Sequence, residues 1–155
     1  MSTPTSPYTI EFWEDDDGRK PVLEWIKNDL TPTQRRALDA AMHSLLQRLG
    51  PDVCASQWGK WVAPGIAEFR LRISGAQVVN AGWAAENEAD MSERILLRIF
   101  FHVYGQKIIM LLEGYDKGAS PGKKTQQTKI ENADKRLQHW RARQAREAKR
   151  EQRGR

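Results

Sequence analysis

A buried strand, a basic loop and a helix follow one another in Lys107-Ile-Ile-Met-Leu-Leu-Glu-Gly-Tyr-Asp-Lys-Gly-Ala-Ser-Pro-Gly-Lys-Lys-Thr-Gln-Gln-Thr-Lys-Ile130. The run from Ile108 to Glu113 has the length and apolar character of a buried strand. The chain then becomes polar and presents Lys117, Lys123 and Lys124. Three cations on a loop that leaves the edge of a sheet predict a binding site for a polyanion.

The same loop resembles a phosphate-binding P-loop, but its spacing differs. That motif has four residues between its glycines and a lysine directly after the second. Only Ala-Ser-Pro stands between Gly118 and Gly122. The backbone N–H groups would therefore not surround a phosphate in the required register, which argues against a nucleoside triphosphatase.

Two further strands are predicted upstream. Ile66 to Ile73 alternates apolar and polar residues, with Glu68, Arg70 and Arg72 on the polar face. Arg94 to Tyr104 is a longer apolar strand that carries Arg98 and His102 on one face. The Tyr104-Gly-Gln106 turn predicts that this strand forms a hairpin with the strand that begins after Lys107.

The N-terminal half predicts one strand and two helices. Residues 1–7 are expected to be disordered, and Tyr8 to Phe12 alternates as a half-buried strand does. Pro21 opens a short helix that ends near Leu30. Thr31 and Gln34 form a capping box around Pro32, which predicts a second helix that ends at Gly50-Pro51.

The remaining segments are less regular. Trp58 and Trp61 are assigned to a loop, and Val78-Val79 could extend the preceding strand within residues 74–92. A second capping box, Thr128 to Glu131, predicts the start of the last helix. The order β-α-α-β-β-β-α predicts an α+β fold over residues 8–140. We expect an antiparallel sheet with two N-terminal helices and a C-terminal helix, all on one side, and a basic tail over 141–155 that frays after about Arg146.

Composition narrows the class of protein. A chain of 155 residues with 39% hydrophobic and 29% charged residues is expected to form one globular domain. No apolar run approaches the roughly 20 residues of a membrane span, and the N-terminus lacks the apolar segment of a signal peptide. Cys54 is the only cysteine, and the three histidines have no metal-ligand spacing. These features predict a cytoplasmic protein without membrane association, metal or cofactor.

The net charge of +5 is distributed unevenly. Residues 1–116 carry a net charge of −4, whereas residues 117–155 hold 13 basic and 4 acidic residues, a net charge of +9. Such asymmetry favours a nucleic-acid surface, because lysine and arginine on phosphates release counterions. A solvated basic tail is an equal alternative for Arg141 to Arg155. The loop from Lys117 to Lys124 favours binding, because it emerges from the core.

The polar faces of the last three predicted strands should meet. If these strands pair in order, Arg70, Arg98 and Lys117 converge on one sheet face. For a single arginine, a solvated face with a cross-strand partner such as Glu68 or Glu113 is the more common arrangement. For three converging cations, we favour a functional site.

These residues occur in an ordered series of motifs. The series is Gly65-Ile-Ala-Glu-Phe-Arg-Leu71, Arg98-Ile-Phe-Phe101, Gly105-Gln-Lys-Ile-Ile-Met-Leu-Leu-Glu-Gly-Tyr-Asp-Lys117, Lys123-Lys-Thr125 and Ile130-Glu-Asn-Ala133. Over residues 8–140 it resembles the RelE/HigB-like toxins, and in particular their phage-derived branch. The resemblance implies the toxin of a type II toxin–antitoxin pair, which enters the ribosomal A site and cuts mRNA without metal. Its implied partners are the ribosome, mRNA and a cognate antitoxin, expected to be a helix-turn-helix protein.

The resemblance also implies roles for individual residues. Catalysis would rest on Arg70, Arg98 and Lys117, with fixed cations stabilising the charge on the phosphate. The proton would be transferred by a lysine with a lowered pKa, by His102 or by Tyr115. The expected catalytic residues are Arg70, Arg98, Lys117 and His102, and the expected RNA-binding residues are Arg72, Tyr115, Lys123 and Lys124.

A non-enzymatic interaction protein on the same fold is the alternative. It would be a topoisomerase-poisoning relative or a phage-derived nucleic-acid-associated protein. Glu113 stands where relatives often have histidine, and the last helix has no tyrosine. These two departures favour the alternative, whereas the cationic surface of Arg98 and Lys117 favours the nuclease.

Overall fold

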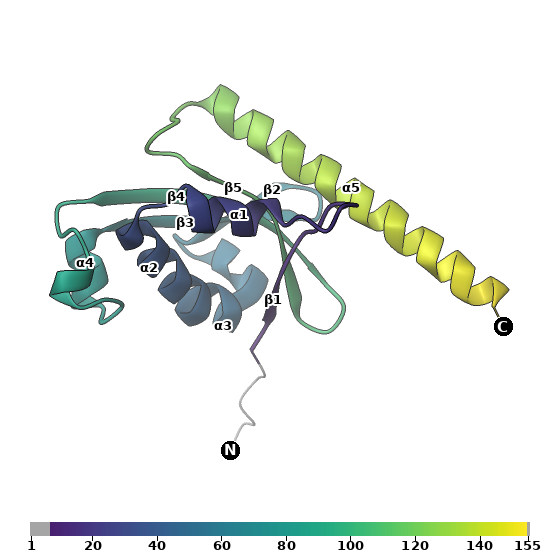
Figure 1. Cartoon of the computed structure of the whole chain (residues 1–155), viewed down its shortest axis with the longest axis horizontal. Coiled ribbons are helices and arrows are strands. Elements are labelled where there is room, and N and C mark those ends of the chain that lie inside the picture. Colours follow the sequence, from purple (N-terminus) through teal and green to yellow (C-terminus); the bar gives the residue numbers. More distant parts are fainter. Residues whose placement is uncertain (1–6, 155) are drawn as a thin grey trace, which may run out of the picture.

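A five-stranded sheet with the strand order β1-β5-β4-β3-β2 organises residues 7–154, which the computed structural model describes (Figure 1). Neighbouring strands are antiparallel except β1 and β5, which are parallel. The α+β class predicted from the sequence is confirmed. The strands are β1 (Thr9–Phe12), β2 (Gly59–Ala63), β3 (Ile66–Ser74), β4 (Arg94–Tyr104) and β5 (Ile108–Asp116).

The helices are short except the last one. Among the described residues, no helix is long and apolar enough to cross a membrane. A π-helical segment, Met42–Leu46, joins α2 and α3 into one continuous helical stretch, and 3₁₀ segments span Gly50–Ala55 and Glu86–Glu88. The α-helices are α1 (Pro21–Asn28), α2 (Pro32–Ala41), α3 (Gln47–Leu49), α4 (Gly75–Asn80) and α5 (Lys123–Arg153).

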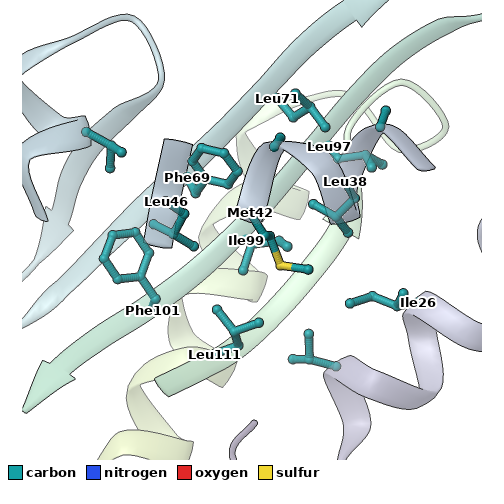
Figure 2. Close-up of a cluster of buried hydrophobic side chains, with 14 of the residues drawn as sticks. Ile26, Leu38, Met42, Leu46, Phe69, Leu71, Leu97, Ile99, Phe101 and Leu111 are labelled. Carbon is teal, nitrogen blue, oxygen red and sulfur yellow. The ribbon is translucent and has the colours of Figure 1, made fainter. Parts of the chain in front are cut away.

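The larger core lies between one sheet face and the N-terminal helices (Figure 2). The alternation in β3 places Phe69 and Leu71 on this face, and both are fully buried. Leu38 and Leu46 reach them from the α2–α3 stretch, as the 3.6-residue spacing predicts. Each such side chain contributes roughly 1.5–3 kcal/mol when fully buried, so this face anchors the sheet.

A second core lies on the opposite face, beneath α5. Phe100 of β4 and Met110 and Leu112 of β5 pack there against Ala133 and Leu137. The expectation that all helices cover one side is therefore wrong. The physical reason is the composition of β4 and β5. These strands are apolar on both faces, which is typical of strands that are covered on both sides.

Two segments differ from their predicted structure. Val78 and Val79 lie in α4 rather than in a strand, because Ser74 and Gln77 form a capping box that starts a helix. Gly75 is required at this start, since a Cβ there would lie 1.7 Å from the carbonyl oxygen of Asp90. The predicted tryptophan loop contains the edge strand β2, which pairs antiparallel with β3.

The start and the end of α5 also differ from expectation. The helix begins at Lys123, after Gly122 with a φ of 118°, and Thr128 lies inside it with its hydroxyl donating to the carbonyl of Lys124. The predicted capping box at Thr128 is therefore wrong. At its other end α5 continues as one helix to Arg153, whereas residues after about Arg146 were expected to be extended or frayed. The predicted disorder of residues 1–7 falls, except for Pro7, outside the described residues.

The capping box at Thr31 provides a test of local stability. The Thr31 hydroxyl accepts from the Gln34 N–H at 3.1 Å and donates to Glu93 at 2.7 Å. We expect Thr31→Ala to lower the free energy of unfolding by about 1–2 kcal/mol. Thr128→Ala is the matched control and should be neutral or stabilising, because alanine is the best helix former. Urea denaturation measures both, and a larger loss for Thr128→Ala would contradict the observed helix boundaries.

Candidate functional site

Three cationic positions meet on the sheet face beneath the start of α5. Arg70 of β3 is the register partner of Arg98 of β4, and Arg98 is in turn the partner of Tyr115 of β5. Lys117 follows on the same face, and its backbone N–H donates to the carbonyl of Leu96 at 2.9 Å. Because register partners on one face are neighbours, the structure brings Arg70, Arg98 and Lys117 together.

A fully buried carboxylate, Glu68, holds these cations in place. Its Oε1 accepts a hydrogen bond from Arg70 Nε at 2.6 Å and forms an ion pair with Arg98 Nε at 3.5 Å. Its Oε2 accepts from Gln126 of α5 at 2.8 Å. A buried carboxylate is tolerated when it is paired and hydrogen-bonded. Glu68 therefore fixes two guanidinium groups and ties them to α5.

Arg98 is the most buried cation of the cluster. It is only 6% exposed, and its Nη1 donates to the Leu97 carbonyl at 3.2 Å. Burial lowers the pKa of Arg98 from its ordinary value; the Glu68 charge opposes this shift and the Arg70 charge adds to it. Arginine nevertheless remains protonated in proteins. Arg98 is thus a fixed positive charge rather than a proton carrier.

Lys117 and Tyr115 are the two groups of the cluster that could transfer a proton. Burial, and next the Arg98 charge, lower the pKa of Lys117 from its ordinary value. Burial, and next the Glu68 charge, raise the pKa of Tyr115, and its buried hydroxyl has no hydrogen-bond partner among the described residues. A lysine with a lowered pKa is the better general base near neutral pH, so Lys117 fits this role.

His102 lies outside the cluster. It is four residues beyond Arg98 on β4, roughly 13 Å along the strand, with the buried Phe100 between them. Its Nδ1 lies 2.7 Å from the carbonyl oxygen of Gly65, and its ring stacks on Tyr104. The structure therefore does not place this predicted catalytic residue beside Arg70, Arg98 and Lys117.

A cleft of about 1040 Å³ opens beside the cluster at the end of the sheet. Arg72, Arg98 and Lys117 line it, together with Gln34, Glu93 and Asp116. Arg72 is exposed. Arg98 and Lys117 are therefore the members of the cluster that line the cleft, whereas Arg70 does not line it.

The predicted RNA-binding lysines lie on the helix rather than in the loop. Lys123 and Lys124 are exposed and occupy the first turn of α5, whose start Gly122 provides no side-chain cap. Cations at a helix N-terminus oppose the helix dipole at about 0.3–1 kcal/mol each. Their position therefore does not stabilise the helix.

Three functional candidates were missed by sequence reasoning. The alternation of β3 assigns Glu68 to a polar face but gives no sign that it is buried. Gln126 lies before the predicted start of the last helix, and Lys60 lies in the unrecognised strand β2, where it is the register partner of Glu68. Of these three residues, the sequence indicates only Glu68, because it lies on the same predicted strand as two arginines.

Glu113 contributes to packing rather than to the cleft. Its carboxylate forms an ion pair with Arg136 at 3.4 Å and accepts from Asn132 at 3.3 Å, both on α5. It also accepts from the backbone N–H of Gly114 at 2.9 Å. Glu113 thus fastens the middle of α5 to the sheet.

Over residues 7–154, no group of three or more histidine, cysteine, aspartate or glutamate side chains could hold a metal ion. No family model, curated protein or solved structure matches the chain. The chemical geometry of the site therefore carries the functional argument.

Proposed function

We propose that this chain is a RelE/HigB-like toxin of a type II toxin–antitoxin pair that cuts mRNA on the ribosome in the cytoplasm. The observation that carries the proposal is the convergence of Arg70, Arg98 and Lys117 beside one open cleft. A helix-turn-helix antitoxin would keep the protein inactive, as the resemblance to this family implies.

The cluster fits cleavage by the RNA 2′-hydroxyl. The 2′ oxygen bonds to the adjacent phosphorus and the bond to the 5′ oxygen breaks, which leaves a cyclic phosphate and a 5′-hydroxyl. Negative charge develops on the phosphate oxygens, where Arg70 and Arg98 would stabilise it. Lys117 would accept the proton of the 2′-hydroxyl, and a proton returned to the 5′ oxygen balances the reaction.

Substrate positioning would come from two sources. The ribosome would splay the mRNA and align the 2′-hydroxyl with the phosphorus. Arg72, Lys123 and Lys124 are exposed cations near the cleft or at the start of α5, and they would hold the mRNA backbone. The two lysines at the helix N-terminus do not stabilise the helix, and their presence there therefore supports a role in binding.

A non-enzymatic interaction protein on the same fold is the second candidate. Two observations favour it: Arg98 and Tyr115 are only 6% and 4% exposed, and Glu113 is engaged with α5. In that case the same cations would bind a nucleic acid or a topoisomerase complex without cutting RNA.

The decisive experiment adds the purified chain to a reconstituted translation reaction with end-labelled mRNA. We expect cleavage that requires ribosomes, and we expect growth arrest when the chain is expressed alone. Co-expression of a small helix-turn-helix protein from the adjacent reading frame should relieve the arrest. Intact mRNA with a folded, harmless protein would favour the interaction protein instead.

A further inference from the structure

The C-terminal part of α5 carries a row of cations that the cleft does not use. The helix has 31 residues, which corresponds to about 46 Å. Its last side chains in the core are Leu137 and the partly buried Trp140. In Figure 1 the C-terminal end of α5 extends beyond the strands. The last turns of α5 therefore do not pack on the sheet.

The last contacts between α5 and the body lie near Arg143. Its Nη2 donates to the Glu14 carbonyl at 3.0 Å and pairs with Asp16 at 3.2 Å. Gln144 and Glu147 still line a groove of about 410 Å³ opposite β1. From Lys149 on, every described residue is exposed.

Four cations form one face of this projecting segment. Arg146, Lys149, Arg150 and Arg153 follow the spacing i, i+3, i+4, i+7, which places them on one side of a helix. We call them the basic ridge. Arg146 comes nine residues after Leu137 in the chain, about two and a half helical turns, so the ridge points away from the sheet.

The basic ridge has no acidic partner in the part of the chain that the structure describes. All four side chains are exposed, and none has an ion pair or a hydrogen bond among the described residues. Glu147 precedes Arg150 by three residues and lies about 60° from it around the helix without an ion pair within residues 7–154, and Glu151 lies about 100° from Arg150. Like charges at i, i+3 and i, i+4 oppose the helix, so a polyanion on this face would stabilise it.

The opposite face excludes a membrane surface as the partner. A membrane-bound amphipathic helix places large apolar residues opposite its cations. In the projecting segment of α5, that face carries Gln144, Ala148 and Glu151. The charge pattern fits phosphates in water, where each cation that meets a phosphate releases a counterion.

We propose that the basic ridge binds the phosphate backbone of an RNA duplex. This inference rests on the proposed function for the identity of the RNA, which would be a helix of ribosomal RNA. Gln126, which donates to Glu68 in the cationic cluster, and Arg150 are separated by 24 residues, or about 36 Å of helix. The ridge is thus a second anchor, far from the cleft that receives mRNA.

The test compares two full-length variants of equal net charge. The ridge variant replaces Arg146, Lys149, Arg150 and Arg153 with glutamine, which keeps good helix propensity. The control variant replaces four exposed cations of the N-terminal half, namely Arg19, Lys20, Lys27 and Arg48, with glutamine. Binding to a fluorescent RNA duplex of about 20 base pairs is measured from 50 to 200 mM salt, with circular dichroism as a check of helix content.

We expect the slope of log K against log salt to fall by about 3.6 in the ridge variant, at about 0.9 for each of four lost phosphate contacts. Over the fourfold salt range this corresponds to a change of about 150-fold relative to wild type. The control variant should keep the wild-type slope. Equal slopes in the two variants would overturn the proposal, because they would show only an effect of net charge.

Two further ligands distinguish RNA from DNA and from a membrane surface as the partner of the basic ridge. A DNA duplex of the same sequence should bind no better than RNA, and vesicles containing phosphatidylserine should bind weakly. A ridge effect confined to DNA, or one seen only on vesicles, would overturn the RNA assignment. The assay contains neither ribosomes nor mRNA cleavage, so its failure leaves the proposed nuclease untouched. Conversely, absent cleavage with intact ridge binding would overturn the nuclease alone.

Discussion

The Arg98→Ala variant is expected to cleave ribosome-bound mRNA about 100- to 1000-fold more slowly than the wild-type chain. The residue is a fixed positive charge, 6% exposed, beside the cleft and paired with Glu68. Its loss removes a cation that would stabilise the developing charge on the phosphate. We therefore expect expression of this variant to cause no growth arrest. Single-turnover cleavage on stalled ribosomes gives the rate.

The fold should survive this substitution, because Arg70 and Gln126 still bond to Glu68. Arg48→Ala serves as the control, since Arg48 is exposed and its Nε bonds only within its own helix, to the Ser44 carbonyl. A folded Arg98→Ala protein that cuts mRNA at the wild-type rate would exclude Arg98 from catalysis. Equal losses in both variants would point to general effects of charge.

The strands that carry the site could be predicted from the sequence alone. Alternation predicts β3, and the Tyr104-Gly-Gln turn predicts the hairpin of β4 and β5, while Arg70 and Arg98 are register partners across β3 and β4. A side-chain period of two fixes which residues share a face. For this reason the meeting of Arg70, Arg98 and Lys117 could be predicted before the structure was known.

The position of α5 could not be predicted in the same way. Its N-terminus at Gly122 has no capping side chain, so Thr128, which matches a capping pattern, was the stronger local signal and misled. The parallel pairing of β1 with β5 also leaves no local signal, because it joins distant segments. Gln126 and the burial of Glu68 depend on where α5 lies, and both were missed for that reason.

Two errors arose from competing local preferences. The β-branched pair Val78-Val79 favours a strand, yet the capping box at Ser74 and the fit of Gly75 against Asp90 start a helix. His102 lies on the same face of its strand as Arg98, but two residues on one face can still be far apart along the strand. The buried Phe100 separates the two residues, and His102 joins the aromatic group of Tyr104 and Trp140.

Glu68→Ala is expected to lower the free energy of unfolding by about 3–5 kcal/mol. The substitution leaves Arg98 buried without its counter-charge and removes the hydrogen-bond acceptor of Gln126. Urea denaturation measures the loss. Glu24→Ala, at an exposed position of α1, should change stability by no more than about 0.5 kcal/mol. A loss for Glu68→Ala as small as that of the control would show that Arg98 does not depend on this carboxylate.

Replacing both partners separates stability from function. In Glu68→Met/Arg98→Met, two apolar side chains of similar reach occupy the buried space, and such exchanges of an ion pair are often neutral or stabilising. We expect this double variant to recover most of the stability that Glu68→Ala loses and yet to leave mRNA intact. Full cleavage by the double variant would show that the ion pair serves the fold alone. Recovered stability without cleavage would mean that the buried pair is kept for the charge that Arg98 presents to the cleft.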